Sequence, residues 1–339
     1  MSEEILSVSN LHTYIETEGA VVRAVDDVSF TLRAGEILGL VGESGCGKSV
    51  TCRTLIGLMP SPPAWSVGEV HYSGLPGRNL LDLRGADLQR LRGAHLSMIF
   101  QDPMSALNPV MRVGDQIEEA IGSHERLGSR ARRKRALELL DRVGIPAASR
   151  RMRSYPHEFS GGMRQRVLIA VAIASRPKIL LADEPTTALD VIIQDQILSL
   201  LLELQRDFGM SVILVSHDLG VIAEMCDRIA VMYAGQIVEL SDAQTLLTEP
   251  RHPYTISLLR SLPDNEQRGR YLPSIPGMPP QLTSVEAGCR FAPRCPLAEV
   301  ECREWETELI PVRGESHLTR CRRHDDTRRP EAWRTESYA

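Results

Sequence analysis

The chain has 339 residues, of which 42% are hydrophobic and 24% are charged, and its formal net charge is −5. This composition is typical of a globular protein with one large core and a smaller unit, and the acidic balance argues against general nucleic-acid binding. The sequence has no run of about 18 apolar residues and no secretory signal pattern, so a reducing cytoplasmic setting is expected, with any membrane role requiring a partner.

The first informative element is a short apolar strand at residues 36–41, followed by a glycine-rich loop and a helix. The loop reads GESGCGKS over residues 42–49, which matches the pattern G-x-x-x-x-G-K-S. Glycines let backbone N–H groups turn around phosphates, and the following helix adds its positive N-terminal end. Lys48 is expected to reach the β- and γ-phosphates of a nucleotide, and Ser49 to ligate Mg²⁺. The predicted nucleotide-binding residues of this segment are Gly42, Ser44, Gly45, Cys46, Gly47, Lys48, Ser49 and Val50.

The region between Gln101 and the segment FSGGM at residues 159–163 is predicted to be a helical insertion. An apolar stripe at helical spacing indicates one amphipathic helix, and consists of Ala136, Leu137, Leu140 and Val143. The basic run at residues 132–135 is interpreted as the solvated start of that helix, in preference to a nucleic-acid site. The segment FSGGM at residues 159–163 precedes a second predicted helix over residues 163–175. Ser160 is either an ordinary helix cap or, with the N–H groups beside it, a contact for phosphate.

Two buried parallel strands follow, and each ends in polar residues. Residues 179–182 form a continuous apolar run before Asp183 and Glu184. Asp183 can hold Mg²⁺, and Glu184 can orient or polarise the attacking water. The run SVILVS at residues 211–216 ends at His217. Because ligands bind at the carboxyl ends of strands in doubly wound folds, His217 is expected to hydrogen-bond the γ-phosphate.

In order and spacing, these motifs resemble those of ABC ATPases over about residues 6–240. FSGGM resembles the family's signature motif, with Met163 where glutamine is common. The resemblance implies that Gln101 is the Q-loop glutamine, that Tyr14 stacks on adenine, and that Asp190 belongs to the D-loop at residues 188–190. It also implies that the signature faces the nucleotide of a second subunit, through Ser160, Gly161 and Gly162. The catalytic residues are then Glu184, His217 and Gln101, and the Mg²⁺ ligands are Ser49, Gln101 and Asp183.

A segment after the ATPase motifs narrows the resemblance. Residues 249–263 read EPRHPYTISLLRSLP, and HPYT is a hallmark of dipeptide and oligopeptide importers. The segment is expected to pack structurally without touching ATP. The resemblance implies the ATPase motor of an ABC importer that takes up di- or oligopeptides, lying peripherally on the cytoplasmic face of the membrane. Nickel and glutathione are alternative substrates within the subfamily, and an ABC ATPase outside transport is an alternative function.

The same resemblance implies several partners. They are a second ATPase subunit that is a related but different chain, two transmembrane permease subunits, and an extracellular or periplasmic substrate-binding protein. No nucleic acid is expected as a partner, because the chain is acidic and has one copy of each motif without the insertions of repair or translation ATPases.

Beyond residue 263 the amino-acid composition changes, and proline and cysteine become prominent. Residues 272–282, LPSIPGMPPQL, are proline-rich and indicate an extended linker. Four cysteines then occur with the spacing C-x5-C-x6-C-x18-C, at Cys289, Cys295, Cys302 and Cys321. The close cysteine pairs of structural zinc sites are missing, whereas iron–sulfur clusters tolerate irregular spacing. Resemblance to importer subunits with this tail implies a [4Fe–4S] cluster, with Zn²⁺ as the alternative and His317 or His324 as substitute ligands.

The predicted fold is an α/β P-loop ATPase of the ABC type, with an antiparallel β subdomain, a helical subdomain and a small loop-rich metal-binding extension. The predicted domains are an ATPase domain at 1–260 with its helical subdomain at about 102–172, a proline-rich linker at 261–284, a four-cysteine domain at 285–325 and a loose tail at 326–339. So small a cysteine domain buries too little apolar surface to fold alone, so it requires a metal or a neighbouring domain.

Overall fold

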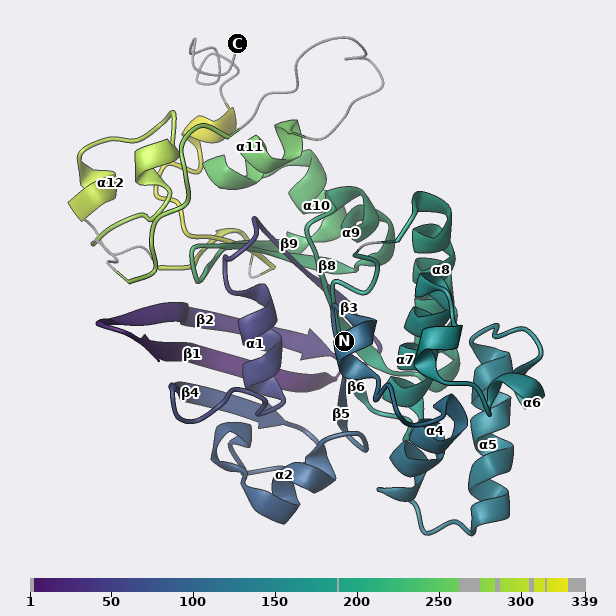
Figure 1. Ribbon diagram of the computed structural model, residues 1–339. Coiled ribbons are helices and arrows are strands. Elements are labelled where there is room, and N and C mark those ends of the chain that lie inside the picture. The colour runs from purple at the N-terminus through teal and green to yellow at the C-terminus, as the bar shows by residue number, and fades with distance from the viewer. Residues whose placement is uncertain are drawn as a thin grey trace. The chain divides into compact units, whose positions relative to one another are not determined.

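The computed structural model of the chain, shown in Figure 1, describes residues 3–187, 189–261, 275–283, 287–304, 308–314 and 316–328. These residues form two compact units. The first unit contains the described residues up to Ile5, Leu32–Ile37 and Tyr72–Val215, and the second contains Leu6–Thr31, Leu38–His71 and the described residues from Ser216 onward. The predicted division at 260, 284 and 325 follows other boundaries and stays a prediction. Residues 262–274 of the expected linker and 329–339 of the expected tail lie outside the described residues.

The first unit is built on parallel strands covered by helices. β6 (Ile179–Asp183) pairs in parallel with β5 (Leu96–Ile99) on one side and with β7 (Ser211–Ser216) on the other. All the residues of β5, β6 and β7 are buried, which the continuous apolar runs predicted for β6 and β7. The helices and 3-10 turns are η1 (Leu80–Asp82), α2 (Gly85–Leu91), α3 (Pro103–Ala106), α4 (Val113–Gly122), α5 (Ser129–Arg142), α6 (Ala148–Arg151), η2 (Pro156–Glu158), α7 (Gly161–Ile173) and α8 (Val191–Phe208).

The predicted helices of this unit form, with small shifts. α5 buries Ala136, Leu139 and Leu140, whereas Leu137 of the expected stripe is only half-buried. The helix expected from Met163 begins at Gly161 because Ser160 accepts the N–H of Met163 and caps the first turn. Within the described ranges, none of the helices has the length and apolarity that crossing a membrane would require.

The second unit contains an antiparallel subdomain and a mixed sheet. β1 (Glu4–Thr17) is the central strand between β2 (Ala20–Arg33) and β4 (Ala64–Tyr72), and most of each strand lies in this unit. Figure 1 shows α1 (Lys48–Leu55) over this sheet, where Thr54 of α1 shares a 2.9 Å hydrogen bond with Thr13 of β1. β3 (Ile37–Val41) runs parallel to β8 (Arg228–Tyr233), and β8 pairs antiparallel with β9 (Gln236–Asp242).

The cysteine tail is part of that mixed sheet. β11 (His317–Thr319) pairs antiparallel with β9, and β10 (Ile310–Arg313) pairs antiparallel with β11. α11 (Pro253–Arg260) covers part of the tail, since its Ile256 packs against Leu297 and Cys295. The other described helices and 3-10 turns of this unit are α9 (Leu219–Met225), α10 (Ala243–Thr248), η4 (Ala292–Arg294), α12 (Glu301–Glu304) and η5 (Asp326–Arg328). The tail therefore docks on β9 through backbone pairing and on α11 through side chains.

Candidate functional site

The loop between β3 and α1 has the geometry of a phosphate-binding loop. At Gly42 an added Cβ would lie 2.0 Å from the Met232 carbonyl oxygen, and at Gly47, with φ 107°, it would lie 2.3 Å from that of Ala24. Only glycine fits these two positions, so the backbone can close tightly against β2 and β8. The Lys48 side chain is buried, and its Nζ donates to the carbonyl oxygens of Gly42 at 2.8 Å and Glu43 at 3.0 Å. A cation is thus held over a loop that leads into a helix N-terminus, which suits an anionic ligand.

The adenine-stacking residue predicted from the resemblance lies in a row of rings. Tyr14 stacks on Trp65 with ring centroids 5.3 Å apart and on His12 with centroids 6.0 Å apart. Trp65 is 42% exposed, which is unusual for so large an apolar side chain. Sequence reasoning missed Trp65 because it follows the motif loop by 16 residues and matches no pattern. His217 lies in the same unit, exposed, directly before Asp218, which caps α9.

The first unit brings Gln101 and Glu184 together. Gln101 Nε2 donates to Glu184 Oε2 at 3.0 Å, and the Thr187 hydroxyl donates to the same oxygen at 2.7 Å. Glu184 has φ 46°, a conformation that costs energy in a non-glycine residue and is concentrated at functional sites. Asp183, the residue before it, is completely buried at the end of β6. Thr187 was not predicted, although its position three residues after Glu184 places it in the same turn.

The signature and D-loop residues begin two helices of the first unit. Ser160 caps α7, and Asp190 caps α8 by accepting the Ile193 N–H at 3.0 Å. Ser160 and Gly161 are exposed, so a helix N-terminus with a hydroxyl faces outward. Both the capping interpretation and a contact with an external phosphate are compatible with this geometry. Ala188 of the expected D-loop lies outside the described residues.

The HPYT segment has a contact that the sequence did not predict. His252 Nδ1 accepts the Tyr254 N–H at 3.1 Å and caps α11, and complete burial lowers the pKa of His252 to about 3, so the ring is neutral. This cap directs Tyr254 inward, where its ring lies 4.6 Å from that of Tyr233. The Tyr254 hydroxyl then accepts the backbone N–H of Glu43 at 2.9 Å. The segment therefore touches the phosphate loop itself, in addition to its structural packing.

All four tail cysteines line one cavity of about 270 Å³, together with His252, Pro253 and Phe291. Each thiol is free, and burial raises the pKa of Cys289 and raises that of Cys295 to about 12. Four thiols around one cavity are the donor set that an iron–sulfur cluster takes. As the side chains lie, however, no group of three or more metal-ligating residues is close enough to hold a metal ion among the residues described. The four cysteines therefore line one cavity, without a metal-ligating arrangement in the part of the chain that the structure describes.

The two histidines expected as substitute ligands differ in position. His317 is buried and its Nε2 lies 2.8 Å from Glu239 Oε1, so it is committed to a buried pair and does not line the cysteine cavity. The proposal of His317 as a substitute ligand is corrected on this ground, because burial of Glu239 requires a polar partner. His324 lies beside the cavity residues, with Nδ1 3.1 Å from the Cys321 carbonyl oxygen.

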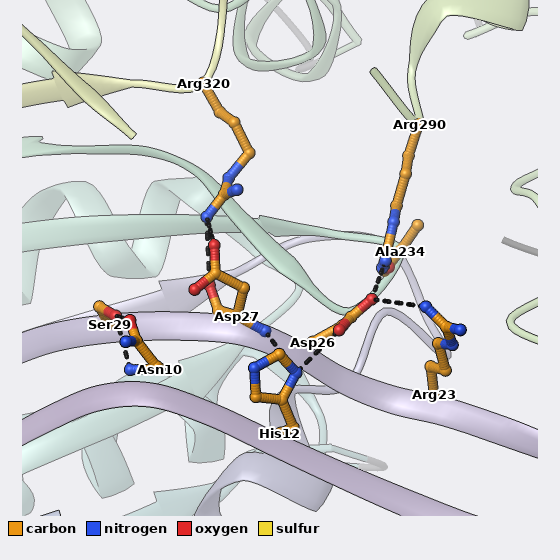
Figure 2. A network of polar contacts seen from close by, with 9 residues as sticks. All are labelled: Asn10, His12, Arg23, Asp26, Asp27, Ser29, Ala234, Arg290 and Arg320. Carbon is orange, nitrogen blue, oxygen red and sulfur yellow. Dashed lines mark hydrogen bonds and ion pairs between the residues drawn. The ribbon is translucent and has the colours of Figure 1, made fainter. Parts of the chain in front are cut away.

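Tail arginines contact acidic residues of β2, as Figure 2 shows. Arg290 pairs with Asp26 and donates to the Ala234 carbonyl oxygen. Arg320 donates to Asp27 Oδ2 at 2.9 Å and to the Asp27 carbonyl oxygen at 3.1 Å. Asp26 also accepts from His12, the ring that stacks on Tyr14. Burial would raise the pKa of Asp26, but Arg290 and His12 outweigh it and hold that pKa below its usual value.

The loop and fold define a P-loop nucleotide-binding protein, and comparisons with known proteins narrow the class. Residues 25–187 match the family "ABC transporter", and residues 238–302 match "Oligopeptide/dipeptide transporter, C-terminal region". The dimeric ATP-binding cassette MJ0796 bound to ADP and Pi has the same fold, with a TM-score of 0.62 and 28% identity over 70% of this chain and 99% of that one.

Two relatives extend the likeness over nearly the whole chain. The dipeptide transport ATP-binding protein DppD of Bacillus subtilis is 48% identical over 321 residues, which cover 94% of this chain and 94% of the relative. The oligopeptide transport ATP-binding protein OppD of Haemophilus influenzae is 46% identical over 300 residues, covering 88% and 91%. The chain belongs to the family of ABC transporter ATP-binding proteins, in its oligopeptide and dipeptide branch. ATP-binding subunits of peptide importers are ATPases coupled to transport.

Proposed function

We propose that the chain is the ATPase subunit of an ABC importer and uses Mg-ATP hydrolysis to drive uptake of di- and oligopeptides. The observation that carries this proposal is the phosphate loop between β3 and α1, contacted by Tyr254 of the HPYT segment. The relatives named for dipeptide and oligopeptide transport support the substrate class. Nickel and glutathione stay alternative cargoes of the same motor.

Each predicted residue has a role that its chemistry supports. In the second unit, Tyr14 stacks on adenine, the Lys48 ammonium binds the β- and γ-phosphates, and His217 hydrogen-bonds the γ-phosphate. The amide groups of the phosphate loop wrap the phosphates, and Val50 follows them in the first turn of α1. The remaining members of the proposed loop set are Gly42, Ser44, Gly45, Cys46 and Gly47.

The residues proposed to hold Mg²⁺ are oxygen donors, which suit a hard cation. They are the Ser49 hydroxyl, the Gln101 amide and the buried Asp183 carboxylate. Mg²⁺, when bound, neutralises charge on the phosphates. Glu184, whose carboxylate is held by Gln101 and Thr187, orients the water that attacks the γ-phosphate. The fixed carboxylate thereby avoids reorganisation during the reaction.

The partners proposed are a second, related ATPase chain, two transmembrane permease subunits and a substrate-binding protein outside the membrane. The exposed N-terminus of α7, with Ser160, Gly161 and Gly162, is available to a nucleotide held by the second ATPase chain. Asp190 is proposed to lie at the same interface. With these partners, the chain is proposed to lie peripherally on the cytoplasmic face of the membrane.

An assay of the purified transporter complex tests the motor role. The complex of this chain with its co-expressed permease subunits is reconstituted into liposomes, and ATP hydrolysis is measured with and without the binding protein and peptide. We expect hydrolysis that peptide stimulates and that Lys48→Ala abolishes. Stimulation by nickel or glutathione, without stimulation by peptides, would replace the proposed cargo. Failure to purify with any membrane subunit would contradict the transport role.

We also propose that Cys289, Cys295, Cys302 and Cys321 hold a [4Fe–4S] cluster. The four free thiols share one cavity, whose walls include the apolar Phe291 and Leu297. A cluster there would cross-link the tail, which has few aliphatic residues of its own. Because ligands must be deprotonated thiolates and burial raises the pKa values of Cys289 and Cys295, loading would release protons.

Anaerobic purification followed by iron, sulfide and zinc analysis tests the cluster. We expect about four iron and four sulfide per chain with a visible absorption band near the blue edge, and loss of both in Cys295→Ser. Cys226→Ser, a change at a buried thiol of α9's C-terminus, is the matched control and should keep the iron. Zinc in place of iron, or iron that survives Cys295→Ser, would contradict the cluster.

A further inference from the structure

Three tail arginines meet three acidic residues of the nucleotide-binding part, and each arginine is next to a tail cysteine in sequence. Arg290 follows Cys289, Arg294 precedes Cys295 and Arg320 precedes Cys321. Their partners are Asp26, Glu43 and Asp27 respectively. The first and third pairs hold the tail on β2, as in Figure 2. The second pair differs because Glu43 is the second residue of the phosphate loop.

Arg294 and Glu43 form a two-pronged ion pair. Nη1 of Arg294 lies 2.7 Å from Glu43 Oε2, and Nη2 lies 3.0 Å from Glu43 Oε1. The guanidinium also donates to the Tyr233 hydroxyl at 3.3 Å and to the Pro276 carbonyl oxygen at 2.9 Å. The Arg294 side chain is 4% exposed and that of Glu43 is 27% exposed. Such bidentate, sheltered pairs are stronger and more directional than surface ion pairs.

The backbone of Glu43 is held as firmly as its side chain. Its N–H donates to the Tyr254 hydroxyl, and its carbonyl oxygen accepts from Lys48 Nζ at 3.0 Å and from the Cys46 N–H at 3.3 Å. The donors and acceptors of this residue are therefore engaged by α11, the tail and the loop itself. Arg294 and Tyr254 thus both contact the second residue of the phosphate loop.

The charge of Glu43 gives this contact a consequence for nucleotide binding. A carboxylate in a loop that wraps phosphates repels the polyphosphate, and Coulomb energies are largest where water is excluded. The guanidinium of Arg294 cancels that charge at hydrogen-bond distance. Burial alone would lower the pKa of Arg294, but its bonds to Glu43 and Tyr233 outweigh burial and raise it, so the guanidinium stays charged.

We propose that Arg294 of the cysteine tail is a positioning residue for the phosphate loop, which neutralises Glu43, holds it in place and so sets the affinity for ATP. This inference rests on the proposed ATP site at that loop. By linkage, ATP binding stabilises the docked tail to the same extent that the docked tail favours ATP. Disruption of the tail would then lower the affinity for ATP through loss of this ion pair.

Equilibrium binding of Mg-ATP to the full-length chain tests the proposal, by calorimetry on Glu184→Gln protein so that no turnover occurs. In that background we expect Arg294→Ala to weaken ATP binding about tenfold, the order of one charge-assisted hydrogen bond. Glu43→Gln should bind ATP as tightly as the parent or more tightly, since the carboxamide carries no charge. Glu43→Gln with Arg294→Ala should regain most of the lost affinity. A bridge with a merely structural role would weaken binding in both single variants.

A matched control separates this contact from general damage to the tail. Arg323 is a tail arginine that pairs with Glu299 and Asp326 and donates to the Leu297 carbonyl oxygen, all within the tail. Arg323→Ala should leave ATP affinity within about twofold of the parent. Arg294→Lys, which keeps the charge and loses the two-pronged geometry, should lie between the parent and Arg294→Ala.

The outcomes distinguish this inference from the proposed function. If the parent protein does not bind ATP, or binds it equally after Lys48→Ala, the ATP site itself is wrong. If the parent binds in a Lys48-dependent way but Arg294→Ala binds as tightly, the inference is overturned. It is also overturned if Glu43→Gln weakens binding as much as Arg294→Ala. Should Arg294→Ala fail to fold, Glu43→Gln and Arg294→Lys still decide the question by the direction of their effects.

Discussion

Replacing Tyr254 with Phe removes one oxygen atom from the contact between the HPYT segment and the phosphate loop. Tyr254 is completely buried, and its hydroxyl accepts the Glu43 N–H at 2.9 Å. Phe keeps the ring contacts with Tyr233 at 4.6 Å and Phe291 at 5.4 Å between centroids, because these involve the ring alone. The variant therefore isolates one hydrogen bond.

The expected loss of stability in Tyr254→Phe comes from the Glu43 N–H, which is left without its acceptor. A buried N–H without a partner costs about 1–3 kcal/mol, and Glu43 is half-buried, so water can reach it in part. We expect the free energy of unfolding to fall by about 1 kcal/mol, and ATP affinity to fall by no more than about fivefold. Fast hydrogen exchange at the Glu43 amide should accompany both changes, because that N–H loses its acceptor.

Hydrogen exchange followed by mass spectrometry, on the loop peptide that contains Glu43, measures the local effect. Tyr72→Phe is the control, since the Tyr72 hydroxyl lies 3.2 Å from His95 Nδ1 and the change removes one comparable hydrogen bond from the first unit. The control should reduce stability slightly and leave exchange at Glu43 unchanged. Equal protection of the Glu43 amide in Tyr254→Phe and in the parent would refute the contact.

Three further predictions concern other parts of the site. Glu184→Gln should stop ATP turnover while ATP binding persists, because the amide cannot act on the attacking water, and turnover near the parent rate would contradict that role. Gly47→Ala places a Cβ 2.3 Å from the Ala24 carbonyl oxygen, at a residue with φ 107°. It should destabilise the fold by about 1–3 kcal/mol more than Gly19→Ala, because Gly19 also has a positive φ but has open space around it. Equal shifts in melting temperature for the two variants would argue against the clash. His252 has a folded-state pKa of about 3, below the ordinary 6.5. The contribution of its neutral ring to the free energy of unfolding is therefore complete above pH 6.5 and is lost as the pH falls toward 3. Between pH 7.5 and 5.5 the parent should lose on the order of 1 kcal/mol more than His252→Asn, which keeps a capping acceptor, and identical pH slopes in urea unfolding would count against a buried neutral ring.

Local patterns accounted for the elements that carry the nucleotide motifs. Continuous apolar runs predicted β6 and β7, and the glycine pattern predicted a loop between β3 and α1. These features depend on neighbours in sequence, which is why periodicity and motif spacing reveal them. Four irregularly spaced cysteines also indicated one shared location, and they line one cavity.

Contacts between distant segments escaped sequence reasoning. Glu43 and Arg294 are separated by 251 residues, and neither belongs to a pattern that points to the other. β10 and β11 are strands of four and three residues, too short to show alternation. β11 pairs with β9, a strand more than 70 residues earlier in the sequence, and β10 pairs with β11. His317 was predicted as a possible substitute for a cysteine ligand. Its pairing with Glu239 was missed, because the two residues are 78 positions apart in the sequence. An acidic residue inside a phosphate loop was the one available signal, since such a charge requires a cationic neighbour.

Uptake of a labelled dipeptide or oligopeptide by cells tests the central claim most directly. The cells lack their own copy of this chain and receive the intact gene, Lys48→Ala or no gene. The account predicts ATP-dependent uptake only in the strain with the intact gene. No uptake is expected in the strain that expresses Lys48→Ala to the same level. Peptide uptake that is equal in all three strains would contradict the assignment of this chain as the motor of a peptide importer.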